Sequence, residues 1–421
     1  MVVPIAEGLL TVPGQDDTRF AGLVRKLRLL ALREILGRDG PGLSRPVARA
    51  MPVVQGALAA SARASSAATL EAIGSEDVLP PVLAMASGLA DADACLRAAV
   101  PPLLVALGSV RGGLPETVLW DVPIGALPLV AHGVLARFTP AARGLVASPS
   151  GVEIRLGGGA LLPADRLRPG ASIPEVELVP TFFPVPGSSA HLSLHDANPL
   201  AMLEEHPDKK GNAVDLGGRA PGDWTAALSE ALELVRLALP TVHAELEGSL
   251  RRIVPVGFEP ERHLSASYRE APGLVYLTLH PSALTLAEAI VHETQHGKLN
   301  VLGWFDPALS NGRTTWTPSP VRPDLRPLSG VLLAVHAFVP VAAMHLRLAE
   351  LGHPITHTPE FAMRRAQVIA GNERGLEIVR RLGEPTAIGR QLLGVLEELH
   401  RATREAAPPG PPADAEALPP G

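Results

Sequence analysis

The feature that most constrains this chain is an HExxH pattern formed by His292, Glu293 and His296. Residues four apart on an α-helix lie one above the other on the same face, so both imidazoles could point at one metal ion. The intervening Glu293 would then lie beside the metal, as a general base or as a residue that orients a ligand. The pattern therefore predicts a metal site on a helix that is packed into the protein.

The residues around the motif predict where this helix begins and ends. Thr285 and Glu288 have the spacing of a capping box, in which two side chains accept backbone N–H groups at a helix N-terminus. Gly297 and Asn300 follow the motif and favour a helix end near residue 300. A strand is expected just before the helix, over 273–279, because this stretch is rich in β-branched and aromatic residues.

The chain as a whole has the composition of a soluble globular protein. It has 421 residues, of which 46% are hydrophobic, and a formal net charge of −6. This length favours two domains, and the lack of a basic excess argues against a nucleic-acid partner. The sequence has no apolar run of membrane-spanning length and no signal-peptide pattern, so we expect no membrane partner. With Cys95 as the single cysteine, a reducing cytoplasm is the expected location.

The spacing of apolar residues changes along the chain. Residues 18–140 have helical spacing, whereas residues 143–195 alternate short apolar stretches with Gly and Pro, as antiparallel strands and turns do. We predict an α+β, predominantly helical fold in which the HExxH helix packs beside a small antiparallel sheet. The expected parts are an N-terminal helical region (1–145), a metal-binding catalytic domain (146–405) and a disordered tail (406–421).

Two histidines seldom hold a catalytic metal alone, so a third protein ligand is expected. A second long helix is predicted over 329–351, and its His336 lies among apolar residues, where a neutral imidazole needs a partner such as a metal ion. We therefore predict His336 as the third ligand. Glu350, His345 and Asp324 are the alternatives left open. A carboxylate would complete the two-histidine, one-carboxylate set that is typical of non-haem iron oxygenases.

A proline-rich loop between the two predicted helices carries Arg322 and Arg326. Guanidinium groups pair bidentately with carboxylates, and the helix N-terminus that follows the loop adds a favourable field for an anion. The loop therefore predicts a carboxylate-binding arrangement. Solvated arginines in a surface loop are the alternative interpretation.

The motif and the arginine loop, residues 292–299 and 322–332, together resemble the HExxH-motif peptide-modification family of bacteria. Members of this family accompany ribosomally made, post-translationally modified peptides. They are linked to iron- and 2-oxoglutarate-dependent β-hydroxylation of precursor-peptide side chains. The resemblance covers residues 250–345 and extends to the N-terminal half only in general character.

The resemblance implies Fe(II) on His292 and His296, chelated by 2-oxoglutarate whose distal carboxylate lies on Arg322 or Arg326. O₂ would be the cosubstrate, and the substrate would be a precursor peptide that is hydroxylated at a side-chain Cβ. Two alternatives remain open, since imidazoles accept zinc as well as iron. The first is a zinc metallopeptidase with Glu293 as the general base. The second is a non-enzymatic peptide-binding protein with a structural metal.

Overall fold

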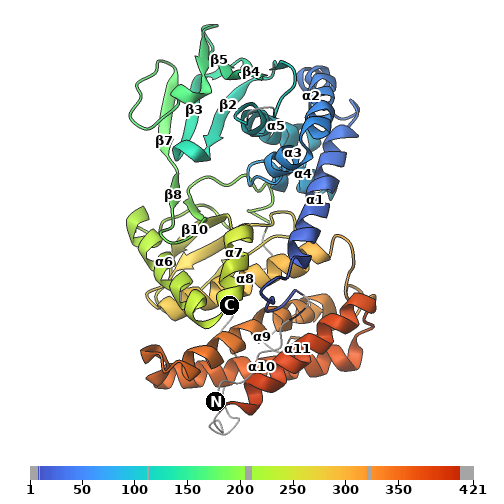
Figure 1. Cartoon of the computed structure of the whole chain (residues 1–421), viewed down its shortest axis with the longest axis vertical. Coiled ribbons are helices and arrows are strands. Elements are labelled where there is room, and N and C mark those ends of the chain that lie inside the picture. Colours follow the sequence, from blue (N-terminus) through green and yellow to red (C-terminus); the bar gives the residue numbers. More distant parts are fainter. Residues whose placement is uncertain (1–7, 9, 111–112, 204–210, 320–323, 408–421) are drawn as a thin grey trace.

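The computed structural model describes residues 8, 10–110, 113–203, 211–319 and 324–407. It confirms the predicted α+β, predominantly helical fold, since 51% of the chain is helical and 17% lies in strands. Figure 1 shows an elongated molecule in which the N-terminal helices and sheets, a middle part around the HExxH helix, and the C-terminal helices are stacked along the long axis.

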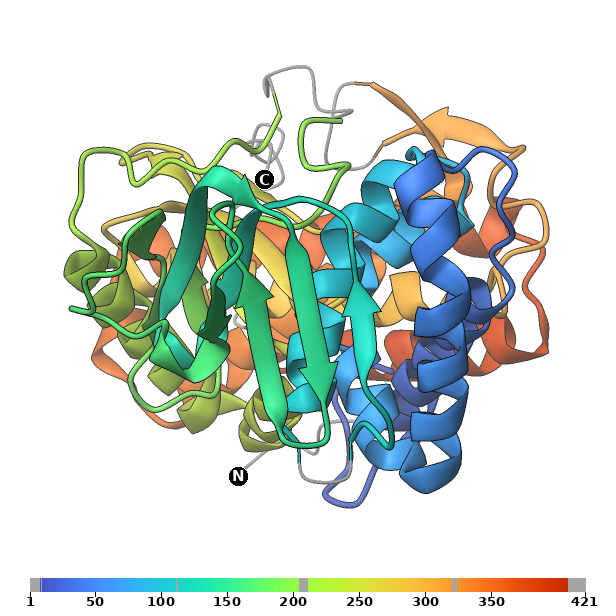
Figure 2. The same cartoon turned by 90° about the horizontal axis from the view of Figure 1, so that it is seen from above.

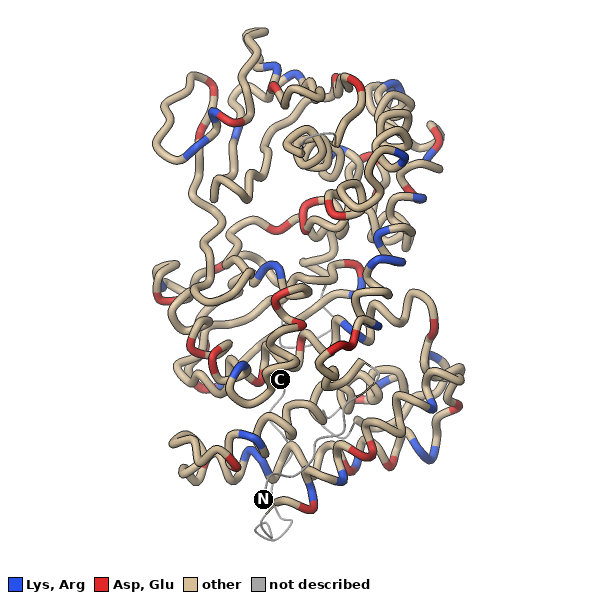
Figure 3. The backbone as a smooth tube through the Cα atoms, in the orientation of Figure 1, with Lys and Arg blue, Asp and Glu red and all other residues tan. Residues whose placement is uncertain are grey.

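The N-terminal part begins with a group of helices. They are α1 (Arg19–Leu36), α2 (Arg45–Ala64), α3 (Ser66–Ile73), α4 (Leu79–Ala86) and α5 (Ala92–Gly108). Helix α1 buries Leu27, Ala31 and Ile35, which recur at the spacing of one helix face, as its apolar pattern predicts. The exposed face carries Arg25, Lys26 and Arg33 together with Leu29, and Figure 3 marks the Lys and Arg positions along the chain in blue.

Two antiparallel sheets follow these helices and lie beside them in Figure 2. Their strands are β1 (Val118–Trp120), β2 (Ile124–Leu129), β3 (Val134–Ala142), β4 (Gly144–Ser148), β5 (Gly151–Arg155), β6 (Leu161–Pro163) and β7 (Val176–Pro180). The strand orders are β1-β4-β5-β6 and β2-β3-β7. The short 3₁₀ helices Val130–His132 and Ala164–Arg166 lie in the connections. The prediction of short strands and tight turns for 143–195 is confirmed by β4 to β7. The helical prediction for 18–140 was wrong at its C-terminal end, where β1, β2 and most of β3 lie.

The predicted division near residue 145 falls inside β4. Strand β4 pairs with β1 and β3 pairs with β7, so both sheets combine strands from the two sides of that division. The larger of two hydrophobic core clusters also extends from Leu10 to Leu399. The division into an N-terminal region (1–145) and a catalytic domain (146–405) stays a prediction.

The middle part is built on a mixed sheet. Its elements are β8 (Phe182–Pro184), β9 (His191–Ser193), α6 (Pro221–Ala238), α7 (Pro240–Ser249), β10 (Arg252–Phe258), β11 (Ser265–Ala266), β12 (Leu274–Leu279) and α8 (Ala283–Leu302). The strand order is β11-β12-β10-β9-β8, in which β10 runs parallel to β9 and β12. The β9–β10 pair is parallel because α6 and α7 form the crossover between these strands. The antiparallel pair beside the HExxH helix is β11–β12.

Helix α8 carries the HExxH motif and begins earlier than the capping-box spacing predicted. Ser282 is its N-cap, and the Ser282 hydroxyl accepts the backbone N–H of Thr285 at 3.3 Å. Glu288 is instead buried and accepts hydrogen bonds from side chains of two other helices. The predicted capping box was therefore wrong, because tertiary contacts engage this carboxylate. The helix ends at Leu302, close to the predicted end.

The C-terminal helices pack beneath α8 in Figure 1. They are α9 (Leu328–Glu350), α10 (Pro359–Leu382) and α11 (Ala387–Glu405), with a hairpin of β13 (Trp316–Pro318) and β14 (Leu325–Pro327) before α9 and a 3₁₀ helix (Pro354–His357) after it. Helix α9 is the one described helix long and apolar enough to cross a membrane, yet 78% of its most apolar window is buried inside the protein. A buried apolar helix is typical of a soluble core. Most of the predicted tail, 408–421, lies outside the described residues.

Candidate metal centre

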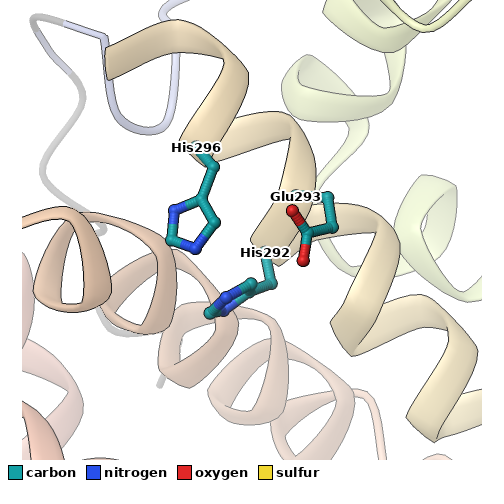
Figure 4. A group of neighbouring side chains, drawn as sticks. All are labelled: His292, Glu293 and His296. Atoms are coloured by element: carbon teal, nitrogen blue, oxygen red, sulfur yellow. The ribbon is translucent and has the colours of Figure 1, made fainter. Parts of the chain in front are cut away.

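Helix α8 brings His292, Glu293 and His296 together, as their spacing predicts. One ring nitrogen of each histidine and one carboxylate oxygen of Glu293 all lie within 4.8 Å of one another. The two imidazole centroids are 4.2 Å apart, with ring planes inclined by 69°. Figure 4 shows the rings one above the other along the helix, with the Glu293 carboxylate beside His292. The three side chains could therefore face one small ligand.

The three donor groups fit a divalent transition metal. Metal–ligand bonds of about 2.0–2.2 Å require two ligand atoms of one ion to lie within about 4.4 Å of each other, so small side-chain rotations suffice to close the site. The Nδ1 atoms of His292 and His296 are buried and have no hydrogen-bond partner in the described part of the chain. Buried imidazole nitrogens without partners are suited to a metal ion. Two imidazoles and a carboxylate accept iron as well as zinc.

Burial keeps both imidazoles neutral. It lowers the pKa of His292 well below its usual value, and the neighbouring His296 and the Arg364 guanidinium lower it further. Burial also lowers the pKa of His296, although the Glu293 carboxylate acts in the opposite direction. A neutral imidazole carries the lone pair that a metal needs. Both histidines are therefore ready to bind a metal near neutral pH.

Two serines hold Glu293 in place. Ser265 Oγ donates to one carboxylate oxygen and Ser267 Oγ to the other, each at 2.6 Å, and Glu293 is 3% exposed. Ser265 lies in the edge strand β11, and Ser267 follows two residues later, so both hydroxyls can reach the same side of the strand. No sequence pattern singled out these two serines. Their alternate spacing, shortly before the expected strand at 273–279, is the signal that could have found them.

His336, the predicted third ligand, does not join this group of donors. It is fully buried, and its Nε2 lies 2.8 Å from the carbonyl oxygen of Leu10. A ring nitrogen that donates to a carbonyl cannot also bind a metal. Burial lowers the pKa of His336 to about 3, and the Lys298 ammonium acts in the same direction, so the ring is neutral. Its role as third ligand stays a prediction that this arrangement does not favour.

The alternative third ligands are engaged elsewhere. His345 Nε2 lies 2.7 Å from Glu288 Oε1. Glu350 pairs with an arginine one turn earlier on α9, and Asp324 pairs at 2.8 Å with the arginine of β14. Within the part of the chain that the structure describes, Glu293 is the additional donor that lies within 4.8 Å of the histidine nitrogens.

The predicted carboxylate-binding arginines have different outcomes. Arg322 lies outside the described residues. Arg326 lies in β14, where its Nε is 2.8 Å from Asp324 Oδ2 and its side chain is 20% exposed. This ion pair occupies one part of the guanidinium. The carboxylate-binding role of both arginines stays a prediction.

Arg364 of α10 is a cation beside the candidate metal centre, and no sequence pattern indicated it. Its guanidinium carbon lies 5.8 Å from the centroid of the Phe338 ring, which in turn lies 4.4 Å from the His292 ring. Its Nε and Nη2 lie 2.8 and 2.7 Å from Glu288 Oε2. Burial alone would raise the pKa of Glu288, but Arg364 and His345 hold it at about 2. No local pattern marks Arg364, because only the packing of α10 on α9 brings it there.

Comparison with known proteins adds no further constraint. No protein-family model matches the chain, and no curated protein matches its sequence. The resemblance to the peptide-modification family therefore stays an interpretation of the motif and of the arginine loop.

Proposed function

We propose that this chain is a metal-dependent oxygenase that uses Fe(II), 2-oxoglutarate and O₂ to hydroxylate peptide side chains. The observation that carries the proposal is the grouping of His292, His296 and Glu293 donor atoms within 4.8 Å. Two imidazoles and one carboxylate, with positions left open for other ligands, are the donor set typical of non-haem iron oxygenases. The resemblance of the motif and of the arginine loop supports a ribosomally made precursor peptide as substrate, modified at Cβ in the cytoplasm.

The chain's own residues would position the reacting groups. The bound iron, with 2-oxoglutarate and O₂, supplies the oxidising power for C–H hydroxylation. Helix α8 presents the two imidazoles on one face, and Ser265 and Ser267 fix the Glu293 carboxylate beside them. The Phe338 ring, 4.4 Å from the His292 ring, restricts the rotation of that imidazole. Such preorganisation lowers the cost of aligning the ligands.

A cation must also hold the distal carboxylate of 2-oxoglutarate. Arg322 and Arg326 are the residues that the resemblance implies. Arg364 is a further candidate, because Glu288 contacts its Nε and Nη2 while 28% of the side chain is exposed. A guanidinium that is bound along one edge can still hold a second carboxylate with its remaining N–H groups.

The edge strand β11 offers a route for a peptide to the metal centre. In the strand order β11 is the outermost strand, paired with β12 on one side. An extended peptide can add to such an edge through backbone hydrogen bonds. Because Ser265 of this strand contacts Glu293, a peptide on the edge would lie close to the donor group.

A zinc metallopeptidase is the second candidate, and the position of Glu293 favours it. A buried carboxylate, held by two hydroxyls next to two metal-binding imidazoles, is also placed as a general base for water activation. In this reading His292 and His296 hold zinc and no 2-oxoglutarate is consumed.

Metal analysis after anaerobic purification, combined with an assay of 2-oxoglutarate conversion to succinate, separates the two candidates. The proposal predicts bound iron and succinate formation that requires Fe(II) and O₂. Bound zinc with cleavage of peptides, and no succinate in the presence of added Fe(II), would favour the peptidase instead.

A further inference from the structure

A large cavity lies between α1, α3 and α7. Its volume is about 960 Å³, at the upper end of the range for small-molecule sites. Phe20 and Val24 of α1 form part of one wall, and Pro240 and Ala244 of α7 form part of another. None of the metal-centre donors lines it. The cavity is therefore separate from the site described above.

The charged side chains around this cavity are three arginines and four carboxylates, and two of the carboxylates, Asp17 and Glu245, pair with Arg19 and Lys298, which do not line it. Arg25, Arg28 and Arg251 all line it. Arg28 Nη1 lies 2.7 Å and Arg251 Nη2 lies 3.5 Å from the carboxylate of Glu71, whose side chain is 65% exposed. Arg25 is exposed and forms no ion pair among the described residues. Glu71 thus serves both Arg28 and Arg251. The less exposed Glu76 is a second partner of Arg251 at 4.0 Å and is shared with a buried arginine, so the three arginines that line the cavity face two carboxylates here.

Arg28 also keeps an unused donor. Its Nε is buried and has no hydrogen-bond partner in the described part of the chain. The guanidinium fits there only because residue 74 is glycine, since a Cβ on Gly74 would lie 2.2 Å from Arg28 Nε. A buried N–H without an acceptor is costly, so an anionic ligand that reached it would be stabilised.

We infer that this cavity binds a small apolar ligand that carries a carboxylate, with its apolar body between α1 and α7 and its charge at the three arginines. An acyl-chain carboxylate and an apolar peptide with a free C-terminus share this chemistry. The inference does not depend on the function proposed for the metal centre.

The cavity is connected to the metal helix through one ion pair. Glu245 lines the cavity and pairs with Lys298, which lies on α8 two residues after His296. Lys298 is 2% exposed, and its Nζ also donates to the carbonyl oxygen of Thr11 at 2.8 Å. A bound ligand would therefore contact a residue that helps to hold α8 in place.

The fluorescent apolar anion 8-anilinonaphthalene-1-sulfonate tests the inference on the full chain. We expect saturable binding of one molecule per chain. Ala21→Trp and Ala244→Trp each place an indole in the cavity from an exposed helix position and should abolish this binding. Ala226→Trp, at an exposed position of α6 outside the cavity, is the matched control and should bind as the parent does.

Charge reversal tests the arginine part of the site. Arg25→Glu should weaken binding of the same anion roughly five-fold, as expected for an exposed charge contact. Lys26→Glu, the neighbouring exposed position of α1 outside the cavity lining, should change it less. His292→Ala should keep full binding, which separates this inference from the proposed function.

Displacement identifies the source of the ligand. Dodecanoate represents an acyl-chain carboxylate, and acetyl-trileucine represents an apolar peptide with a free C-terminus. We expect at least one of them to displace the fluorescent anion. Dodecanol and acetyl-trileucine amide, which lack the charge, should displace it more weakly. The inference would be overturned if neither carboxylate displaced the fluorescent anion, or if the neutral compounds displaced it equally well. It would also be overturned if Ala21→Trp and Ala244→Trp left the binding of the fluorescent anion unchanged.

Discussion

The imidazole Nε2 of His336 lies 2.8 Å from the carbonyl oxygen of Leu10 and ties the N-terminal segment to helix α9. Lys298 of α8 makes the corresponding contact with the carbonyl oxygen of Thr11, at 2.8 Å. Leu10 and Thr11 are both buried. The N-terminal segment is therefore held between α8 and α9 by two side chains that contact its backbone carbonyl oxygens.

This contact predicts a structural role for His336. His336→Ala leaves a cavity and a buried carbonyl without a donor, so the free energy of unfolding should fall by roughly 2–4 kcal/mol. Metal content at neutral pH should stay that of the parent. Chemical denaturation and metal analysis measure the two effects, and His336→Gln, which keeps a donor, should recover part of the stability. Loss of metal in a folded His336→Ala variant would instead support His336 as the third ligand.

Glu293→Gln distinguishes the two candidate reactions. In an oxygenase Glu293 supplies the carboxylate of the donor set and no water has to be deprotonated, so activity should fall in proportion to the iron that the variant loses. In a zinc peptidase the same change removes the general base and should nearly eliminate activity. Ser265→Ala, which removes one of the two hydroxyls that hold the carboxylate, is the companion variant and should have the smaller effect. Near-complete loss of activity in Glu293→Gln, with metal and 2-oxoglutarate still bound, would contradict the oxygenase.

Local sequence patterns were sufficient to predict the elements that carry the site. The HExxH spacing predicted α8, apolar periodicity predicted α9, and β-branched residues predicted β12, because each signal lies within one element. The start of α8 was missed since both Ser282 and Thr285 are plausible caps, and only the packing of Glu288 decides between them.

Contacts between distant residues could not be predicted in this way. Ser265 and Glu293 are 28 positions apart, and Leu10 and His336 are 326 apart. A histidine among apolar residues has the same local pattern whether its partner is a metal or a carbonyl group. Arg364 likewise lies near the candidate metal centre only because of the packing of α10. Its contact with Phe338 therefore cannot be predicted from the sequence around either residue.

The proposed function requires a cation for the distal carboxylate of 2-oxoglutarate, and substitution should identify it. Arg322, Arg326 and Arg364 are each replaced by Ala in turn. The variant that lacks the carboxylate-binding arginine should bind 2-oxoglutarate more weakly by about 1.5–3 kcal/mol, roughly ten- to a hundred-fold. Lys should restore it only in part, because an ammonium cannot reproduce the fork. Calorimetric titration with 2-oxoglutarate at unchanged iron content is the measurement. Parent-like affinity in all three Ala variants would exclude the carboxylate-binding role.

The buried Glu288 predicts an acid-dependent stability. Its pKa is lowered to about 2 in the folded protein. The ionised carboxylate therefore adds to the free energy of unfolding above the unfolded pKa near 4.5, and this stabilisation is lost as the pH falls towards 2. Glu288→Gln should therefore destabilise the protein at pH 6, by on the order of 3 kcal/mol at most. The difference between parent and variant should shrink between pH 5 and about 2 in denaturation experiments. A stability difference between parent and variant that stays constant over this pH range would contradict an ionised, paired Glu288 in the folded protein.

The most direct test of the account is the metal content of the parent, His292→Ala and His296→Ala proteins after anaerobic reconstitution with Fe(II). His357→Ala, at an exposed position after α9, is the matched control. We expect the parent and the control to retain iron, whereas either motif variant loses it and keeps its helical circular dichroism. Retention of iron by both motif variants at the level of the parent would contradict a metal centre on α8.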